Sequence, residues 1–329
     1  MKIAVIGGVS STRVVIQKLC QHGFTSVFVF GYEPQNTLNV SGWTDLSAIA
    51  NEAGYIYQPF RKVIECTEFI REFAPDLVFA VGLSQIIPES LLRIPAKGFV
   101  GFHPTKLPLG RGRAPLAWLI LDQNDGAASF FIMQDGVDDG PILAQVPFSV
   151  EFSDDASSLE EKMLRAEAIA LDHLLLKLAD GTVESSPQDH NSATYYGKRS
   201  PEDGWINWRY KAVDILTHIR ASCAPHPGAF TFDQDEKIVI TRAKLSLSDC
   251  QKGVVGRIIE VTDNGEFLIQ CGDSCLWILE WTATPEWLPR VGRMLGFYAE
   301  CEIVKLRSQI SSLQCKINDL ENLILGMVE

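Results

Sequence analysis

The sequence predicts a mixed α/β protein with a doubly wound, mostly parallel sheet, then a small C-terminal β-barrel domain and a C-terminal coiled-coil helix. Three observations indicate this architecture. Short apolar strands alternate with amphipathic helices up to about residue 180, the pattern of a parallel sheet covered by helices. Five or six short strands follow within about 75 residues, which is typical of a small antiparallel barrel. The chain then ends in an unbroken heptad repeat.

Length and composition set the broad class. A chain of 329 residues suits two domains that each bury a core, and 46% hydrophobic with 21% charged residues is ordinary for a soluble protein. No apolar run reaches the roughly 18 residues that a membrane span needs, and "MKIAVIGGVSS" reads as a buried first strand rather than a signal peptide. We therefore expect a cytoplasmic protein without membrane contact. The net charge of −12 argues against a nucleic-acid partner.

The eight cysteines show no repeated spacing. "CGDSC", from Cys271 to Cys275, has no second Cys or His pair nearby that would complete a zinc site. We expect no metal, and we interpret the cysteines as half-buried thiols in a reducing compartment.

The elements of the first domain can be placed in order. After a Ser11 N-cap we expect a helix over Thr12–Gln21, then one over Val63–Phe73 and one over Ser157–Leu178 that ends at Gly181. "IGGVSS" after the first strand is not the G-x-G-x-x-G of a dinucleotide site, and no acidic residue closes a second strand, so a nicotinamide cofactor is not expected. The short β-branched or aromatic runs that we expect to be strands are 2–7, 26–31, 76–82, 99–103 and 128–133.

The chain divides, on these patterns, into a catalytic domain over residues 1–182, a connection over 183–208 and a barrel domain over 209–298. The connection is rich in turn residues throughout. The barrel domain opens with a helix, "AVDILTHIRAS", before its short strands. Residues 299–329 form the coiled-coil helix.

The heptad repeat predicts how two chains would pair. Isoleucine at a with leucine at d is typical of a parallel two-stranded coiled coil, whereas a helix folded back on its own domain needs a wider apolar stripe. In parallel register, Glu302 pairs with Arg307 and Lys316 with Glu321, both of opposite charge. We therefore expect a homodimer. The a positions are Ile303, Ile310, Ile317 and Ile324, and the d positions are Leu306, Leu313, Leu320 and Met327.

A candidate catalytic residue, His103, ends the apolar strand "FVGFH". In a doubly wound sheet, ligands bind at the carboxyl ends of the strands. A strand-end histidine is by itself more often a packed structural residue, but "QDGVDDGPIL" follows about 35 residues later with Asp135, Asp138 and Asp139. A carboxylate beside an imidazole fixes its tautomer and suits a general acid or base. Because adjacent side chains point in different directions, at most one of Asp138 and Asp139 should face His103.

Three stretches in this order carry a family resemblance: "FHPTKLPLGRGRAPLAW", "GVDDGPIL" and "QDHNSATYYGKRSPEDGWINW". Together they resemble the folate-dependent formyltransferases, which include methionyl-tRNA formyltransferase and bacterial enzymes that formylate nucleotide-linked amino sugars. The similarity covers about residues 1–298, and "IRASCAPHPGAF" resembles the start of that family's C-terminal barrel. "RGRAP" resembles the UDP-4-amino-arabinose formyltransferase type.

The resemblance implies a Rossmann-like formyltransferase fold and transfer of a formyl group from N10-formyltetrahydrofolate to a primary amine. The family motif is Asn-x-His followed by Asp-x-Gly, so it implies that His103 and Asp138 are catalytic. His103 would hold the oxyanion that develops and relay the proton. The resemblance also implies folate contacts from Gln85, Ile86, Ile87, Arg113, Gln134, Asp135, Gly136 and Val137.

The sequence departs from the family motif at Gly101, which stands where the family has its asparagine. The asparagine donates to the oxyanion, and losing one such donor typically costs about 10²–10³ in rate. Either a water molecule or a backbone N–H supplies the lost hydrogen bond, or the acceptor or acyl donor differs enough that the wider space is useful.

Several functions remain open on the sequence. The first is N-formylation of a nucleotide-linked amino sugar. The second is tRNA formylation, which the barrel region disfavours: residues 209–299 hold 10 Lys and Arg against 11 Asp and Glu, a net charge of −1, where a tRNA-binding barrel should be basic. The third is a catalytically silent scaffold that keeps the folate cleft, and Gly101 is its best support. Another small amine, or another acyl group, is also open.

Overall fold

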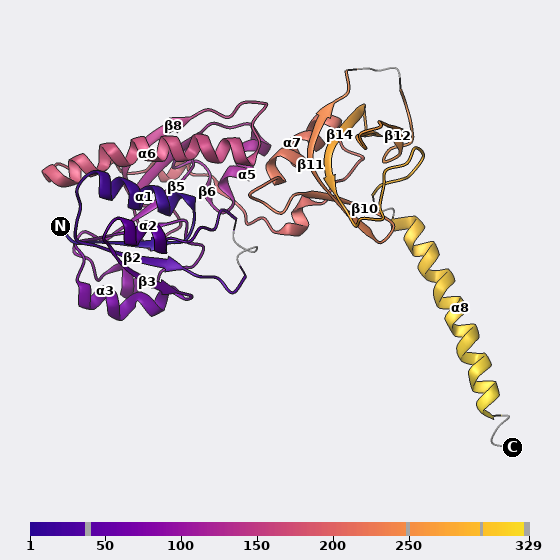
Figure 1. The fold of residues 1–329 in the computed structure, drawn as a ribbon, viewed down its shortest axis with the longest axis horizontal. Helices are drawn as coiled ribbons and strands as arrows, with labels where there is room; N and C mark the ends of the chain where they lie inside the picture. Colours follow the sequence, from indigo (N-terminus) through magenta and orange to yellow (C-terminus); the bar gives the residue numbers. More distant parts are fainter. Residues whose placement is uncertain (37–40, 248–250, 297–298, 326–329) are drawn as a thin grey trace. The chain divides into compact units, whose positions relative to one another are not determined.

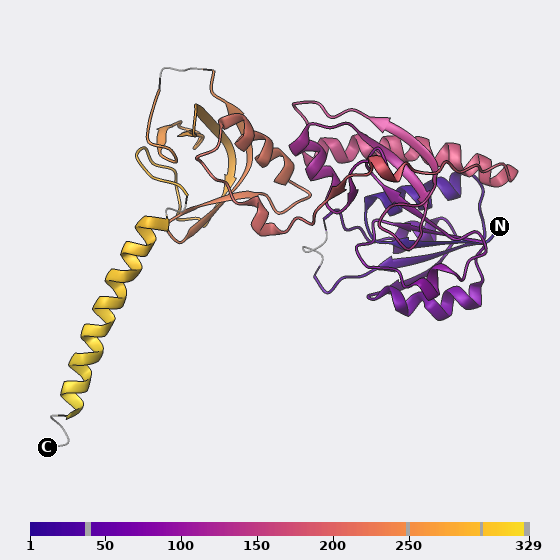
Figure 2. The ribbon, with the colours of Figure 1, turned by 180° about the vertical axis from the view of Figure 1, so that it is seen from behind.

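The structure of the protein is a computed structural model (Figures 1 and 2). It describes residues 1–36, 41–247, 251–296 and 299–325. The chain divides into two compact units, one of Met1–Gly204 with Thr217–Gly228 and one of Trp205–Leu216 with Ala229–Glu329. The helix α7 (Ala212–Ser222) therefore contributes residues to both units.

The first unit contains a seven-stranded sheet in the order β3-β2-β1-β4-β5-β7-β8. The first five strands in this order, β3, β2, β1, β4 and β5, are parallel to one another. By contrast, β7 is antiparallel to both β5 and β8. The predicted mostly parallel sheet is confirmed. Its strands are β1 (Ile3–Gly7), β2 (Val27–Tyr32), β3 (Ile56–Phe60), β4 (Leu77–Val81), β5 (Phe99–His103), β7 (Gly126–Ile132) and β8 (Ile142–Phe148).

Helices cover both faces of this sheet, as a doubly wound fold requires (Figure 1). One face packs against α1, α5 and α6, and the other against η2, α3 and α4. Each face has its own apolar core, so strands such as β1 are buried on both sides. The bounds of the helical elements in this unit are α1 (Ser10–Gln21), α2 (Ser47–Glu52), η2 (Val63–Cys66), α3 (Thr67–Phe73), α4 (Glu89–Leu92), α5 (Pro115–Asp122), α6 (Ala156–Asp180), η3 (His190–Ser192) and η4 (Pro201–Gly204).

Four strands were not expected from the sequence. β3 and β8 are the sheet edges, and each contains a proline, Pro59 and Pro147, which weakens the strand pattern there. β6 (Arg111–Gly112) and β9 (Tyr195–Tyr196) have two residues each, too few to show any periodicity. The expected Ser11 cap is wrong, because Val9 occupies the N-cap of α1 and Ser11 lies buried inside the helix.

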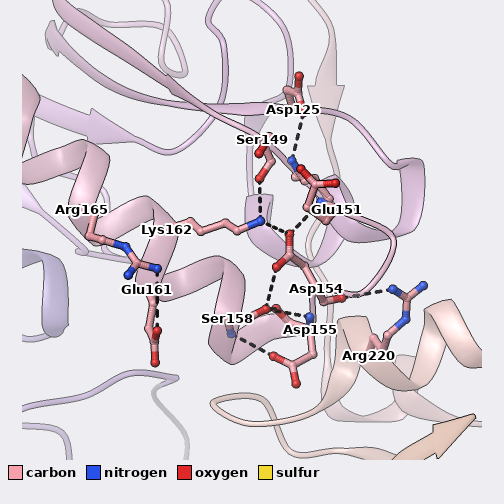
Figure 3. Close-up of polar contacts among 11 residues, drawn as sticks. Asp125, Ser149, Glu151, Asp154, Asp155, Ser158, Glu161, Lys162, Arg165 and Arg220 are labelled. Atoms are coloured by element: carbon pink, nitrogen blue, oxygen red, sulfur yellow. Dashed lines mark hydrogen bonds and ion pairs between the residues drawn. The ribbon is translucent and has the colours of Figure 1, made fainter.

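The start of α6 is fixed by a dense polar network (Figure 3). Asp155 is the N-cap and accepts a hydrogen bond from the Ser158 amide. The buried Asp154 carboxylate accepts from Lys162 at 2.6 Å, the Glu151 amide at 2.7 Å and the Ser158 hydroxyl at 2.9 Å. Burial alone would raise the pKa of Asp154, but these hydrogen bonds outweigh it and lower the pKa. The helix ends at Gly181 in the left-handed conformation, as predicted.

The second unit is built on a five-stranded antiparallel sheet in the order β10-β11-β14-β13-β12. The segment after β14 hydrogen-bonds both edge strands of this sheet: the Gly296 amide donates to the Phe232 carbonyl at 2.7 Å, and the Gly292 amide donates to the Ile258 carbonyl at 2.9 Å. The strands are β10 (Ala229–Asp233), β11 (Glu236–Leu245), β12 (Ile258–Val261), β13 (Phe267–Gln270) and β14 (Cys275–Thr282).

The C-terminal segment is a helix, α8 (Ala299–Leu325). Its a and d side chains are about half exposed, from 48% at Ile303 to 57% at Leu320 and 61% at Ile324. The apolar stripe is therefore exposed in the described part of the chain. The d residue Met327 lies outside the described residues.

None of the helices in the described part of the chain is both long and apolar enough to span a membrane. Among the same residues, no group of three or more His, Cys, Asp or Glu side chains is placed to hold a metal ion.

Candidate active site

His103 ends β5, hydrogen-bonded into the sheet beside β7, and its side chain is buried. Its Nε2 lies 2.8 Å from the Gly110 carbonyl oxygen, and its Nδ1 lies 3.4 Å from Asp138 Oδ2. Because a carbonyl oxygen only accepts, Nε2 carries a proton and the remaining ring nitrogen faces the carboxylate. The structure thus brings together the two residues that the sequence singled out.

Asp138 reaches His103 from the loop between β7 and β8. Its backbone has φ +51°, the left-handed region that residues other than glycine rarely adopt. Its Oδ2 also accepts a hydrogen bond from the Gly112 amide at 2.9 Å. The carboxylate is therefore held between a backbone donor and the imidazole.

The geometry of the pair defines what it can do chemically. Nε2–H donates to the Gly110 carbonyl. If Nδ1 carried no proton, its lone pair would point at a lone pair of the Asp138 carboxylate oxygen, and the two would repel each other. A proton between them turns this repulsion into a charge-assisted hydrogen bond. The pair is therefore suited to taking up one proton from a reacting group and returning it.

The two-residue strands β6 and β9 hold the backbone around Gly110 and Gly112, the hydrogen-bond partners of His103 and Asp138. They pair in parallel, Arg111 with Tyr195 and Gly112 with Tyr196. The Gly110 amide donates to Thr194 Oγ1 at 2.8 Å. The segment 183–208, expected to be only a connection, thus supports in the first unit the backbone groups that bind His103 and Asp138.

Two buried polar side chains near the pair were missed by sequence reasoning. Arg111, 1% exposed, donates to Gln188, and Gln188 in turn donates to the backbone of the Asp138 loop. Both stand in the motifs quoted for the resemblance, but nothing in the sequence marks them as buried.

The other carboxylates of the loop do not face His103. Asp139 lies against Gly136, where a Cβ atom would meet its carboxylate, and its Oδ1 is buried without a hydrogen-bond partner in the part of the chain that the structure describes. Asp135 is exposed. Only one of the two adjacent aspartates faces the imidazole, as expected.

Gly101 precedes His103 by two residues, so both positions lie on the same face of β5. The space above Gly101 is filled: a Cβ atom there would lie 2.7 Å from Phe131 Cζ and 3.0 Å from Met133 Cγ. An asparagine at this position would therefore have to displace the phenyl ring.

The residues implied in folate binding are spread over three loops. Ile86 is 90% exposed and Val137 is 58% exposed, whereas Ile87 is buried in the core. The Gln85 amide group is engaged locally, accepting from the Val63 amide at 2.8 Å and donating to Arg61 at 2.8 Å. The remaining residues of this set are also exposed: Arg113, Gln134, Asp135 and Gly136.

Family models match most of the chain. The formyl transferase model matches residues 1–175, and the formyl transferase C-terminal domain model matches residues 198–284. The chain belongs to the formyl transferase family. The resemblance drawn from the sequence is thereby confirmed, and the chain is assigned to a family of group-transfer enzymes.

Solved structures of this family share the fold at low identity. HypX from Aquifex aeolicus, in complex with tetrahydrofolic acid, is 16% identical with a TM-score of 0.63 over 89% of this chain and 46% of that chain. This chain thus spans about half the length of HypX. An N-formyltransferase from Helicobacter canadensis, in complex with folinic acid and dTDP-3-aminofucose, is 17% identical with a TM-score of 0.63 over 86% and 100%. Methionyl-tRNA formyltransferase from Clostridium thermocellum is 22% identical with a TM-score of 0.54 over 76% and 95%.

Proposed function

We propose that this formyltransferase moves a formyl group from N10-formyltetrahydrofolate to the primary amine of a nucleotide-linked amino sugar. The observation that carries the proposal is the pairing of the buried His103 with the partly buried Asp138, whose geometry suits the uptake of one proton. The Helicobacter relative, which was solved with folinic acid and a dTDP-linked amino sugar, supports the donor and the class of acceptor.

The residues present fit a folate donor. Ile86 and Val137 expose apolar surface that suits a pterin ring, and exposed backbone in the 134–137 loop can read its amide edge. When bound, N10-formyltetrahydrofolate supplies the formyl carbon that the acceptor amine attacks. His103 and Asp138 take the proton that the amine loses as its C–N bond forms. They return it to the nitrogen released when the old C–N bond breaks, so the proton count balances.

The charge of the predicted barrel region, residues 209–299, supports a small acceptor over tRNA. Residues 209–299 carry a net charge of −1, whereas binding of a phosphate backbone is driven mainly by Lys and Arg. In that unit we also propose that the sheet closes into a barrel through residues 292–296, which hydrogen-bond both edge strands.

The exposed stripe of α8 supports a parallel homodimer as the working form. Its apolar a and d side chains are unpartnered within the described chain. A second copy in parallel register would cover them and would place Glu302 against Arg307 and Lys316 against Glu321.

A catalytically silent scaffold is the second candidate, and one observation favours it. Phe131 fills the space where the family asparagine would donate, so position 101 offers the reaction no side-chain hydrogen bond. The scaffold would keep the folate loops and assemble through α8.

One assay separates these functions. The protein is incubated with N10-formyltetrahydrofolate and a panel of UDP- and dTDP-linked amino sugars, and tetrahydrofolate release and product mass are measured. We expect a mass gain of one formyl group on an amino sugar. Folate binding without turnover on any acceptor would support the scaffold, and formylation of charged initiator tRNA alone would overturn the proposal.

A further inference from the structure

Gln188, in the segment before β9, is a buried amide with both ends fully engaged. Its Nε2 donates to the Asp138 carbonyl at 2.9 Å and to the Gly140 carbonyl at 2.7 Å. Its Oε1 accepts from Arg111 Nη2 at 2.7 Å and from Arg111 Nε at 3.2 Å. A single side chain thus connects β6 to the backbone on both sides of Asp139.

The chemistry of the partners fixes the direction of this network. A guanidinium group only donates and a backbone carbonyl only accepts, so the amide can satisfy both sides in one orientation alone. Arg111 also donates to Tyr195 Oη at 3.2 Å and lies 3.4 Å from His190 Nδ1, but no carboxylate in the described part of the chain forms an ion pair with it. A buried cation without a counter-ion is costly, which argues that its placement serves more than stability.

The network acts on a backbone position of the site that lies in the left-handed region. Asp138 has φ +51°, and a residue in a sparsely populated conformation persists only where its surroundings impose it. Gln188 holds the carbonyl of Asp138 itself and that of Gly140, while the Gly112 amide holds its carboxylate. The Gly112 amide belongs to β6, and Gln188 is tied to β6 by its hydrogen bonds to Arg111.

We propose that Gln188, oriented by Arg111, is a positioning residue that sets the distance and direction of the Asp138 carboxylate toward His103. The proposal rests on the proposed function. Under this proposal the segment 183–208 contributes to catalysis, because its residue Gln188 positions the Asp138 carboxylate. A misplacement of about 1 Å in a catalytic group can cost 10²-fold in rate.

The test is Gln188→Glu in the full-length protein. The carboxylate keeps the shape of the side chain and gives Arg111 a counter-ion, but it cannot donate to either carbonyl. The matched control is Gln145→Glu on β8, a partly buried amide, which donates to Leu107 O at 3.2 Å and Ser129 Oγ at 2.9 Å and not to the Asp138 loop. We measure kcat, the acceptor KM, and the nitrogen-15 chemical shifts of the His103 ring, which report its tautomer and its hydrogen bonds.

For Gln188→Glu we expect kcat to fall about 100-fold with little change in KM, and the His103 Nδ1 signal to move. Gln145→Glu should leave both unchanged. If Gln188→Glu behaved like Gln145→Glu in rate and ring signals, the positioning role would be overturned. Should wild type transfer no formyl group while the ring signals still move only in Gln188→Glu, the proposed function fails and the positioning role stands.

A second variant covers a failure to fold. Arg111→Met/Gln188→Met removes the buried cation together with the amide, so no unpaired charge remains. If this folded variant kept the wild-type rate and the wild-type His103 signals, the inference would be wrong.

Discussion

At the residue scale, the chemistry depends on which side chains the imidazole of His103 contacts. Its two ring nitrogens face the Gly110 carbonyl and the Asp138 carboxylate, and the side chain is buried away from solvent. Asp139, one residue away, turns toward Gly136 instead.

This difference predicts unequal effects of the two aspartates. His103→Ala and Asp138→Asn should each lower kcat by about 10²–10⁴-fold, the usual contribution of general acid–base catalysis, with folate affinity largely kept. Steady-state kinetics and folate titration measure both effects. Asp139→Asn is the control and should be mild; an equal loss in Asp139→Asn would show that the whole loop, and not the pair, was disturbed.

Gly101 is the second residue whose environment decides its role. Because Phe131 and Met133 occupy the space above it, Gly101→Asn alone should destabilise the fold by about 1–3 kcal/mol, as overpacking does, without a gain in kcat. Gly101→Asn/Phe131→Leu makes room for the amide, so we expect it to regain stability and to raise kcat. Thermal unfolding and kinetics on both variants provide the measurement.

Gly101→Ala separates packing from chemistry, since it adds the same Cβ without the amide. It should share the stability loss and show no rate gain in either background. A rise in kcat for Gly101→Asn alone, at unchanged stability, would contradict the view that the phenyl ring blocks this position.

At the scale of single elements, α6 carries a buried acid that the chemistry does not use. Glu167 is fully buried among core side chains, and neither of its carboxyl oxygens has a hydrogen-bond partner among the described residues. Burial raises the pKa of Glu167 well above its usual value. A raised folded-state pKa means that stability falls as pH rises from the unfolded-state pKa through the folded-state pKa.

Glu167→Gln should therefore be more stable than wild type at neutral pH, and its advantage should shrink as pH falls toward about 4.5. Over that range the difference should change by at most about 1.4 kcal/mol per pH unit, the limit for one proton. Urea unfolding at several pH values measures it. Glu161→Gln, exposed on the same helix, is the control and should follow the wild-type curve; a Glu167→Gln curve parallel to wild type would refute the prediction.

At the scale of the whole molecule, the exposed stripe of α8 predicts the assembly state. Ile310→Lys/Ile317→Lys places two charges at a positions and should give a monomer at micromolar concentration, because buried unpaired charges are not tolerated in the seam. Ser308→Lys/Cys315→Lys adds the same charge at the outer f positions and should remain a dimer. Sedimentation equilibrium distinguishes them, and a wild-type monomer at that concentration would end the coiled-coil hypothesis.

The sequence by itself determined the fold class, the family and the catalytic candidates. Buried parallel strands such as β1 are short continuous apolar runs, and glycine at 181 ends α6 for a local reason, the left-handed cap. The heptad repeat likewise needs only spacing to be seen. These signals are local, so periodicity and residue type carry them.

Tertiary structure alone decided how the site is built. Arg111, Gln188 and Asp138 are far apart in sequence, and their contacts arise only when β6 pairs with β9 and the loop after β7 returns to His103. Strands of two residues are too short to show a periodic pattern in the sequence. The ring of Phe131 lies above Gly101 because the strand register places the two residues opposite each other, and neither residue type alone predicts this. Long-range pairing sets which groups meet, because hydrogen bonds and packing are decided by distance in space.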